Sequence, residues 1–132
     1  MTKPFIFNEQ TGVHDGWNDP IHGRVSWHTL FSGDITPSEQ LSGGIARLDP
    51  GGELKPHRHD PAEIYFVLEG TLDLTVDGTM QQLQSQSGIF IPGNAEHGCR
   101  NNGTSIVRFL YVFAVDRFSD VLYRFPETGT AS

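Results

Sequence analysis

Four side chains that can bind a metal ion occur in two short segments of the chain. One segment contains His57, His59 and Glu63, and the other ends in His97. If the first segment is extended, His57 and His59 lie on the same side of the strand, because side chains alternate with a repeat of about 7 Å. Glu63 begins the next predicted strand and His97 comes from a separate hairpin, so all four can approach one point. Three imidazole nitrogens and one carboxylate oxygen suit a divalent ion of Fe, Mn, Co, Ni or Zn.

Tyr65 is the candidate catalytic residue. It follows Glu63 by two positions in a predicted strand, so both side chains lie on the same face. A divalent cation beside the phenol lowers its pKa, which would let Tyr65 act as a general base or orient a ligand. A core aromatic residue with a satisfied hydroxyl is the alternative role.

Four other residues are candidates for the same pocket. Cys99 shares its strand parity with His97, and a buried, unreactive thiol is the expected role. Arg47 and Arg108 lie in the middle of predicted strands and are expected to face solvent, because an inward charge is costly without an anionic partner. Alternation alone leaves the direction of Tyr123 open.

Alternating apolar and polar residues, with frequent turn signals, predict the elements that carry these side chains. Leu72, Leu74 and Val76 alternate with polar residues, and Asp77-Gly78 then allows a tight hairpin turn. Fifteen Gly and eight Pro residues, with 36% hydrophobic and 19% charged residues, favour an all-β chain over a helical bundle. The predicted strands are 24–31, 44–48, 62–68, 71–77, 79–83, 88–91, 105–115 and 120–125, with one predicted helical turn at 36–41.

Length and charge limit the class of protein. We expect one domain over 1–132, with an irregular N-terminal arm over about 1–22 and a barrel core over about 24–125. A net charge of −7 argues against nucleic acid as a partner, and no apolar run reaches the ~20 residues that span a membrane. We expect a cytoplasmic protein that acts on a small molecule. The strands over 64–68 and 106–113 are apolar on both faces, which predicts a homodimer.

The first of the two segments resembles the first motif of the cupin superfamily, G(X)5HXH(X)3-4E(X)6G. All of its positions are matched, by Gly51, His57, His59, Glu63 and Gly70. The resemblance implies a single-domain cupin, a small jelly-roll barrel also called a double-stranded β-helix.

The second segment is similar to the second cupin motif, G(X)5PXG(X)2H(X)3N. It is matched at Pro92, His97 and Asn101, while Asn94 replaces the middle Gly and Gly88 lies closer to Pro92 than usual. Asn tolerates the left-handed conformation that Gly would supply. The two motifs together imply that a metal ion is bound by His57, His59, Glu63 and His97.

Among cupins, the chain is similar to the small dimethylsulfoniopropionate lyases in size, in ligand set and in the placement of Glu63-Ile64-Tyr65, with Tyr123 as a late tyrosine. This resemblance implies β-elimination, in which the metal holds the substrate carboxylate and acidifies the α carbon while Tyr65 takes the α proton. A non-haem iron dioxygenase and a sugar-acid isomerase are the alternative enzymes. A small-molecule-binding cupin module is the non-enzymatic alternative.

Overall fold

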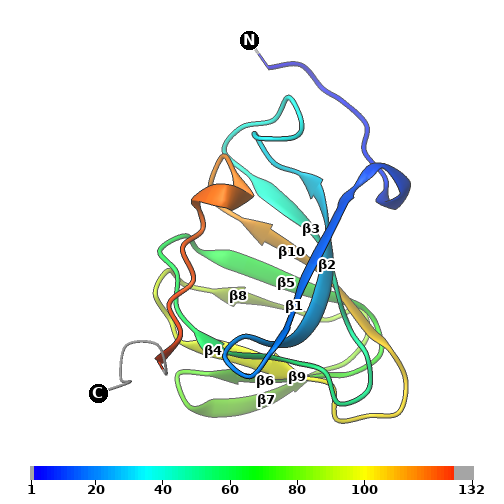
Figure 1. The fold of residues 1–132 in the computed structure, drawn as a ribbon, viewed down its shortest axis with the longest axis vertical. Coiled ribbons are helices and arrows are strands. Elements are labelled where there is room, and N and C mark those ends of the chain that lie inside the picture. Colours follow the sequence, from blue (N-terminus) through cyan, green and yellow to red (C-terminus); the bar gives the residue numbers. More distant parts are fainter. Residues whose placement is uncertain (1, 127–132) are drawn as a thin grey trace.

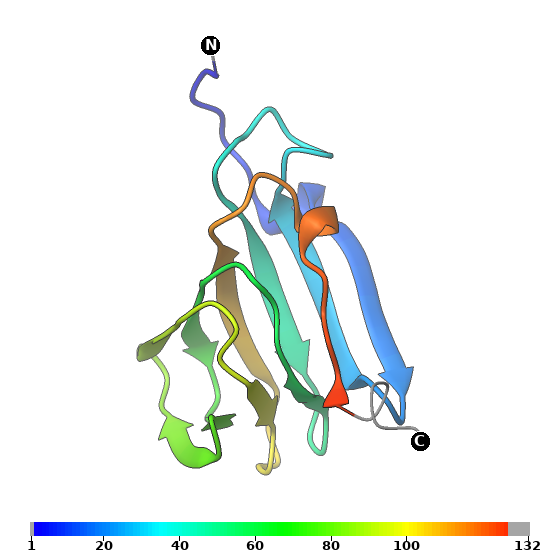
Figure 2. The same cartoon turned by 90° about the vertical axis from the view of Figure 1, so that its left-hand side faces the viewer.

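Ten antiparallel strands form one coiled sheet in the computed structural model, which describes residues 2–126 (Figure 1). The strand order is β7-β6-β9-β4-β2-β3-β10-β5-β8, and β1 pairs with β2 beside this path. The bounds are β1 Val13–Asp19, β2 Gly23–Phe31, β3 Ser42–Leu48, β4 Glu53–His57, β5 Glu63–Glu69, β6 Leu72–Val76, β7 Thr79–Leu83, β8 Gly88–Ile91, β9 His97–Arg100 and β10 Val107–Phe113. The sheet curls into a barrel (Figure 2), which confirms the predicted all-β fold.

The described residues contain two helical segments, both of three residues. These are the 3-10 helices η1 (Glu9–Thr11) and η2 (Phe118–Asp120). No helix in the part of the chain that the structure describes is long and apolar enough to cross a membrane. The helical turn predicted at 36–41 is not formed, since these residues are bends and irregular backbone.

Two predicted segments differ from the structure at the chain ends. Residues 13–19, expected to belong to an irregular arm, form β1, which pairs with β2 along its whole length. Their alternation is weak because most side chains of this strand are exposed. Residues 120–125, predicted as a strand, contain the last residue of η2 and, as β pairing, the isolated bridge from Arg124 to Arg58. The predicted domain spans 1–132, of which residues 1 and 127–132 lie outside the described part.

The core is filled by inward side chains that alternate along the strands. On β10 every second residue is buried, including Phe109, Tyr111 and Phe113, and β5 buries Tyr65 and Val67 in the same way. Because β5 and β10 are hydrogen-bonded neighbours, these rows pack directly against one another. The outward side chains of the same two strands are half-buried or exposed.

Residues 116–125, here called the C-terminal strap, run from η2 along the open side of the barrel (orange to red in Figure 1). The backbone N–H of Gly33 donates to the carbonyl of Asp116 at 2.7 Å at the start of the strap. At its end, Arg58 and Arg124 exchange two backbone hydrogen bonds of 2.9 Å. The strap is therefore tied to the barrel at both ends.

Candidate metal centre

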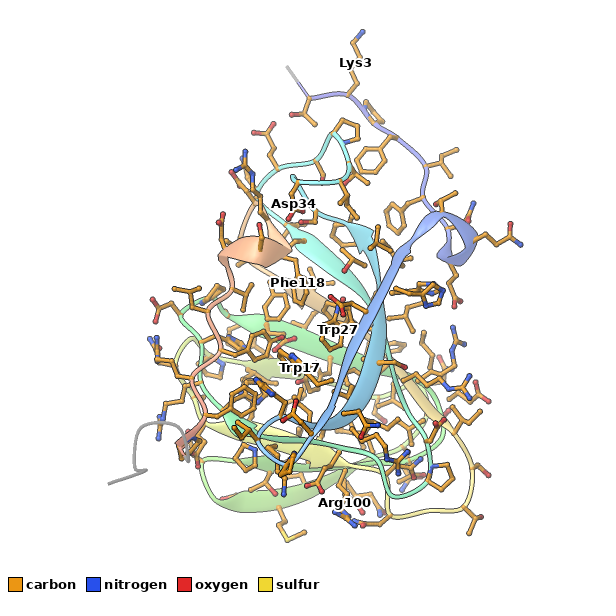
Figure 3. The ribbon with its side chains drawn as sticks, viewed as in Figure 1. Lys3, Trp17, Trp27, Asp34, Arg100 and Phe118 are labelled. Carbon is orange, nitrogen blue, oxygen red and sulfur yellow. The ribbon has the colours of Figure 1, made fainter. Side chains whose placement is uncertain are left out.

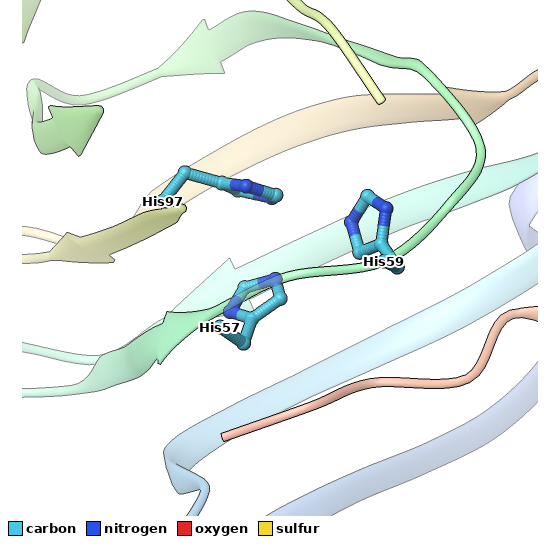
Figure 4. A group of neighbouring side chains, drawn as sticks. All are labelled: His57, His59 and His97. Atoms are coloured by element: carbon cyan, nitrogen blue, oxygen red, sulfur yellow. The ribbon is translucent and has the colours of Figure 1, made fainter. Parts of the chain in front are cut away.

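Three histidine rings converge inside the barrel (Figure 4). His57 ends β4 and pairs in register with His97, which begins β9, while His59 follows two residues after β4. The three ligand nitrogens lie within 4.8 Å of one another, and all three residues are completely buried. The fold therefore brings these three histidines together, as the sequence predicts.

Backbone carbonyls determine which nitrogen of each ring carries the proton. His57 Nδ1 lies 2.8 Å from the carbonyl oxygen of Lys55, His59 Nδ1 lies 3.0 Å from that of Pro61, and His97 Nδ1 lies 2.9 Å from that of Ala95. A carbonyl only accepts, so each Nδ1 donates and each neutral ring keeps a lone pair on Nε2. The three lone pairs face a common point.

His57 Nε2 is a buried polar atom without a hydrogen-bond partner among the described residues. Burial, with a smaller contribution from the neighbouring His97, holds the pKa of His57 well below its ordinary value. The ring is therefore neutral, which is the form that binds a metal ion. An unpartnered lone pair of this kind is costly unless something fills the space before it.

Glu63 lies at the centre of the same cluster. Its Oε1 is 3.1 Å from His59 Nε2 and 3.3 Å from His97 Nε2, and its side chain is buried. A carboxylate oxygen and an unprotonated nitrogen both accept hydrogen bonds, so this approach needs a positive charge between them. The donor set and its geometry fit a divalent ion: His57, His59 and His97 are positioned to bind one, and Glu63 is the predicted fourth ligand.

Tyr65 and Cys99 both point into the barrel, as their parity predicts. Tyr65 is on the same face of β5 as Glu63, and burial, with the negative charge of Glu63, raises its pKa well above the ordinary value. Burial also raises the pKa of the Cys99 thiol, to about 12. Cys99 is therefore a protonated core thiol, in agreement with the expected role.

The two arginines lie outside the barrel, as expected. Arg47 is exposed and bonds to Asp49 at 3.1 Å. Arg108 is half-buried and contacts Glu9 at 2.5 Å and Glu69 at 3.7 Å. Neither guanidinium contacts His57, His59 or His97.

Tyr123 comes to the site from the C-terminal strap. Its ring centroid lies 4.9 Å from that of His57 and 5.3 Å from that of His59. The side chain is half-buried, and desolvation, with the negative charge of Glu63, raises its pKa well above the ordinary value. The strap therefore closes the barrel over the histidines.

A cavity of about 30 Å³ lies beside the histidines, and Glu63, Tyr65 and Tyr123 contribute to its wall. One water molecule needs roughly 10–15 Å³ on this measure, so the cavity holds more than one. Several aromatic wall residues were not among the sequence candidates, namely Trp17, Trp27, Tyr111 and Phe118. For Tyr111, the alternation along β10 indicates a side chain that points into the barrel. Trp17 and Phe118 lie in segments with little alternation, so the sequence gives no signal that they point into the cavity.

Residues 44–113, more than half of the chain, match the family model described as a cupin domain. This chain belongs to the cupin family. The motif positions also have the expected backbone, since Gly51, Gly70 and Asn94 all have positive φ, the last at 65° where the motif usually has Gly. The cupin assignment thus agrees with both the sequence motifs and the barrel.

Curated relatives of this cupin include two kinds of enzyme and a polyketide protein. It is 41% identical to the dimethylsulfoniopropionate lyase DddW of Ruegeria pomeroyi over 126 residues, 96% of this chain and 82% of the relative. Over 69 residues it is 33% identical to the 5-nitrosalicylic acid 1,2-dioxygenase of a Bradyrhizobium species and 32% identical to the polyketide synthase CurC of Streptomyces cyaneus. Those 69 residues cover 32% and 45% of the two relatives, respectively.

Solved structures share the fold of this cupin at low sequence identity. The polyketide cyclase RemF of Streptomyces resistomycificus has a TM-score of 0.75 at 21% identity, covering 96% of this chain and 86% of RemF. A cupin 2 conserved barrel domain protein of Rhodopseudomonas palustris has a TM-score of 0.74 at 20% identity, covering 88% of this chain and 78% of that one. At these identities the likeness concerns the barrel alone.

Proposed function

We propose that this cupin is a metal-dependent lyase that cleaves dimethylsulfoniopropionate to dimethyl sulfide and acrylate. The observation that carries the proposal is the 41% identity to a dimethylsulfoniopropionate lyase along nearly the whole chain. The buried cluster of three histidines and a carboxylate supports it, because it offers a place for the ion that such chemistry uses.

Four side chains would hold the ion: His57, His59 and His97 through Nε2, and Glu63 through its carboxylate. The bound ion supplies a Lewis acid that polarises the substrate carboxylate and acidifies the adjacent α carbon. The backbone carbonyls that receive the Nδ1 protons keep the three rings in the required tautomer and orientation.

Tyr65 is the proposed proton acceptor. The α C–H bond breaks and its electrons form the C=C bond of acrylate, while the C–S bond breaks and its electrons leave with dimethyl sulfide; the proton passes to the Tyr65 oxygen. Burial and Glu63 raise the pKa of Tyr65 in the protein without an ion. Positive charge at the histidine cluster acts in the opposite direction and favours the phenolate.

The strap and the barrel together shield this site from bulk solvent. Tyr65, Glu63 and the three histidines are buried, and Tyr123 covers the histidines from the strap. A site that is closed to water strengthens the electrostatic interactions inside it.

The test is release of dimethyl sulfide into the headspace, with acrylate measured in the same samples. The protein is stripped of metal with a chelator and then loaded separately with Fe, Mn, Co, Ni or Zn. We expect cleavage that depends on the added ion. A loaded protein that binds an ion at the cluster and releases no sulfide would contradict the proposal.

A dioxygenase is the second candidate function, favoured by the 33% identity to 5-nitrosalicylic acid 1,2-dioxygenase over 69 residues. That match includes only about half of this chain. Oxygen uptake by the iron-loaded protein, measured against catechols, flavonols, diketones and salicylates, distinguishes it. Oxygen uptake without sulfide release would move the protein to this class.

A further inference from the structure

A second pocket, of about 160 Å³, lies on the outer face of the barrel. His28, Arg47 and Arg108 line it and alternate with buried residues of β2, β3 and β10, so these side chains point away from the barrel interior. The polar side chains in its wall are Glu9, His14, Ser26, His28, Arg47 and Arg108. The proposed lyase reaction uses none of them.

Strand pairing brings the basic side chains of this pocket together. Arg47 on β3 is the register partner of Arg108 on β10 and of Ser26 on β2. His28 on β2 is the register partner of His14 on β1. Register partners have Cα atoms about 4.5–5.5 Å apart, and like charges placed opposite one another in this way repel. The two facing arginines therefore need negative charge beside them.

The carboxylates of the chain supply that charge only in part. Arg108 contacts Glu9 at 2.5 Å, but its 3.7 Å approach to Glu69 is too long for a hydrogen bond. Among the described residues, the guanidinium of Arg47 makes one hydrogen bond, from Nε to Asp49 at 3.1 Å. Both Nη groups of Arg47 therefore remain available as donors to a ligand.

His28 has a further unused nitrogen. Its Nε2 is buried and has no hydrogen-bond partner in the part of the chain that the structure describes. Burial, with the nearby His14 and Arg108, lowers the pKa of His28, while Glu9 acts in the opposite direction. A neutral ring still carries one N–H, which Nε2 can donate. Positive charge thus surrounds this ring, although the chain as a whole has a net charge of −7.

We propose that this outer pocket binds a tetrahedral oxyanion, either free phosphate or the phosphate group of a small ester. Guanidinium groups bind phosphate through paired N–H donors. The basic side chains come from four neighbouring strands, so they can bond more oxygens than the two of a carboxylate. A metal cation is disfavoured because Arg47 and Arg108 line the same pocket. Glu9 competes with the ligand for Arg108.

The test is an NMR titration of the zinc-loaded protein with inorganic phosphate and, separately, with methyl phosphate. The imidazole C–H resonances of His14 and His28 report on the pocket, and His14→Gln and His28→Gln assign them. Zinc is diamagnetic and keeps the histidine cluster inside the barrel occupied. Chloride holds the ionic strength constant throughout each titration.

We expect saturable shifts of both resonances, and about tenfold weaker phosphate binding by Arg108→Gln and by Arg47→Gln, because each variant loses a charge-assisted hydrogen bond. Glu9→Gln should bind several-fold more tightly, because the competing carboxylate is gone. Arg100→Gln is the matched control and should leave the affinity unchanged. Arg100 lies near one end of the barrel, away from Trp27 in the pocket wall (Figure 3).

Methyl phosphate that binds as tightly as phosphate assigns the pocket to phosphate esters, and clearly weaker binding assigns it to the free ion. Shifts that chloride alone reproduces, that do not saturate, or that survive both arginine variants would overturn the site. A response to excess zinc without one to phosphate would overturn it too, as would shifts confined to the histidines of the barrel cluster. If an arginine variant does not fold, tighter binding by Glu9→Gln still decides the matter.

Discussion

A single backbone carbonyl sets the tautomer of each histidine in the cluster. The nitrogen that faces the centre of the cluster is therefore the unprotonated one, which can bind a metal ion. His57 and His59 are close in sequence, yet each needs its own acceptor, from Lys55 and Pro61. Without these bonds the rings could turn their protonated nitrogen inward, which would repel a cation.

Removal of one ligand should empty the site. We expect the wild-type chain to bind about one divalent ion and His59→Ala to bind it at least about 100-fold more weakly, since loss of an outer partner alone costs 10–100-fold. Elemental analysis after equilibration with limiting metal measures this, and His14→Ala serves as a histidine control outside the cluster. A wild-type protein that stays metal-free after exposure to Fe, Mn, Ni and Zn would defeat the assignment.

Loss of one oxygen atom at Tyr65 should separate chemistry from packing. Tyr65→Phe keeps the buried ring, so metal content and folding should be unchanged while kcat for sulfide release falls on the order of 10² or more. Both quantities are measured on the same preparations. Sulfide release that ignores the hydroxyl would remove Tyr65 from catalysis.

At the scale of elements, the pairing of β1 with β2 brings two histidine rings into contact on the outside of the barrel, with their planes tilted by 50°. His14 and His28 are register partners with ring centroids 3.2 Å apart. Burial, with the nearby His14 and Arg108, lowers the pKa of His28, while Glu9 acts in the opposite direction. Arg47 and Arg108 line a surface pocket together with these two histidines. The folded chain therefore resists protonation at this position.

Acid should lower the free energy of unfolding of the protein through His28. Because the folded pKa of His28 is lowered, the unfolded chain binds more protons below about pH 6.5, so stability falls as the pH drops through that value and is unaffected above it. Unfolding free energies of wild type and His28→Gln, measured between pH 7.5 and 5.5, should diverge by roughly 0.2–1 kcal/mol in favour of the variant. Parallel pH profiles would refute the effect.

At the scale of the whole molecule, the outer face of β5, β10 and β8 carries apolar side chains that no segment within residues 2–126 covers. Ile64 is 41% exposed and Phe90 is 65% exposed, and they are register partners on neighbouring strands. Val112 and Leu110 continue the same face on β10. A contiguous apolar face of this kind marks an interface.

The homodimer predicted from the sequence therefore remains our expectation, with this face as the contact. Light scattering at micromolar concentration should give the mass of two chains, and Phe90→Lys should shift the protein to one chain, because a buried unpaired ammonium is costly at an interface. Sulfide release per chain serves as the folding control. A folded wild-type protein that is strictly monomeric would contradict the expectation.

The ligand spacing and the all-β class were readable from the sequence because both depend on local rules. Alternation determines that His57 and His59 share a side and that Tyr65 faces inward with Glu63, and turn residues such as Asn94 mark where strands end. These rules act over a few residues and need no knowledge of distant contacts.

The cover of the site was decided by tertiary structure alone. Trp17 lies in an exposed edge strand with little alternation, and Tyr123 lies in a strap that is no strand, yet both line the cavity. The strap is placed by hydrogen bonds between Gly33 and Asp116, and between Arg58 and Arg124, across long stretches of chain. The tertiary structure likewise sets the direction of the Tyr65 pKa shift, because that shift depends on burial by surrounding segments, which no local pattern encodes.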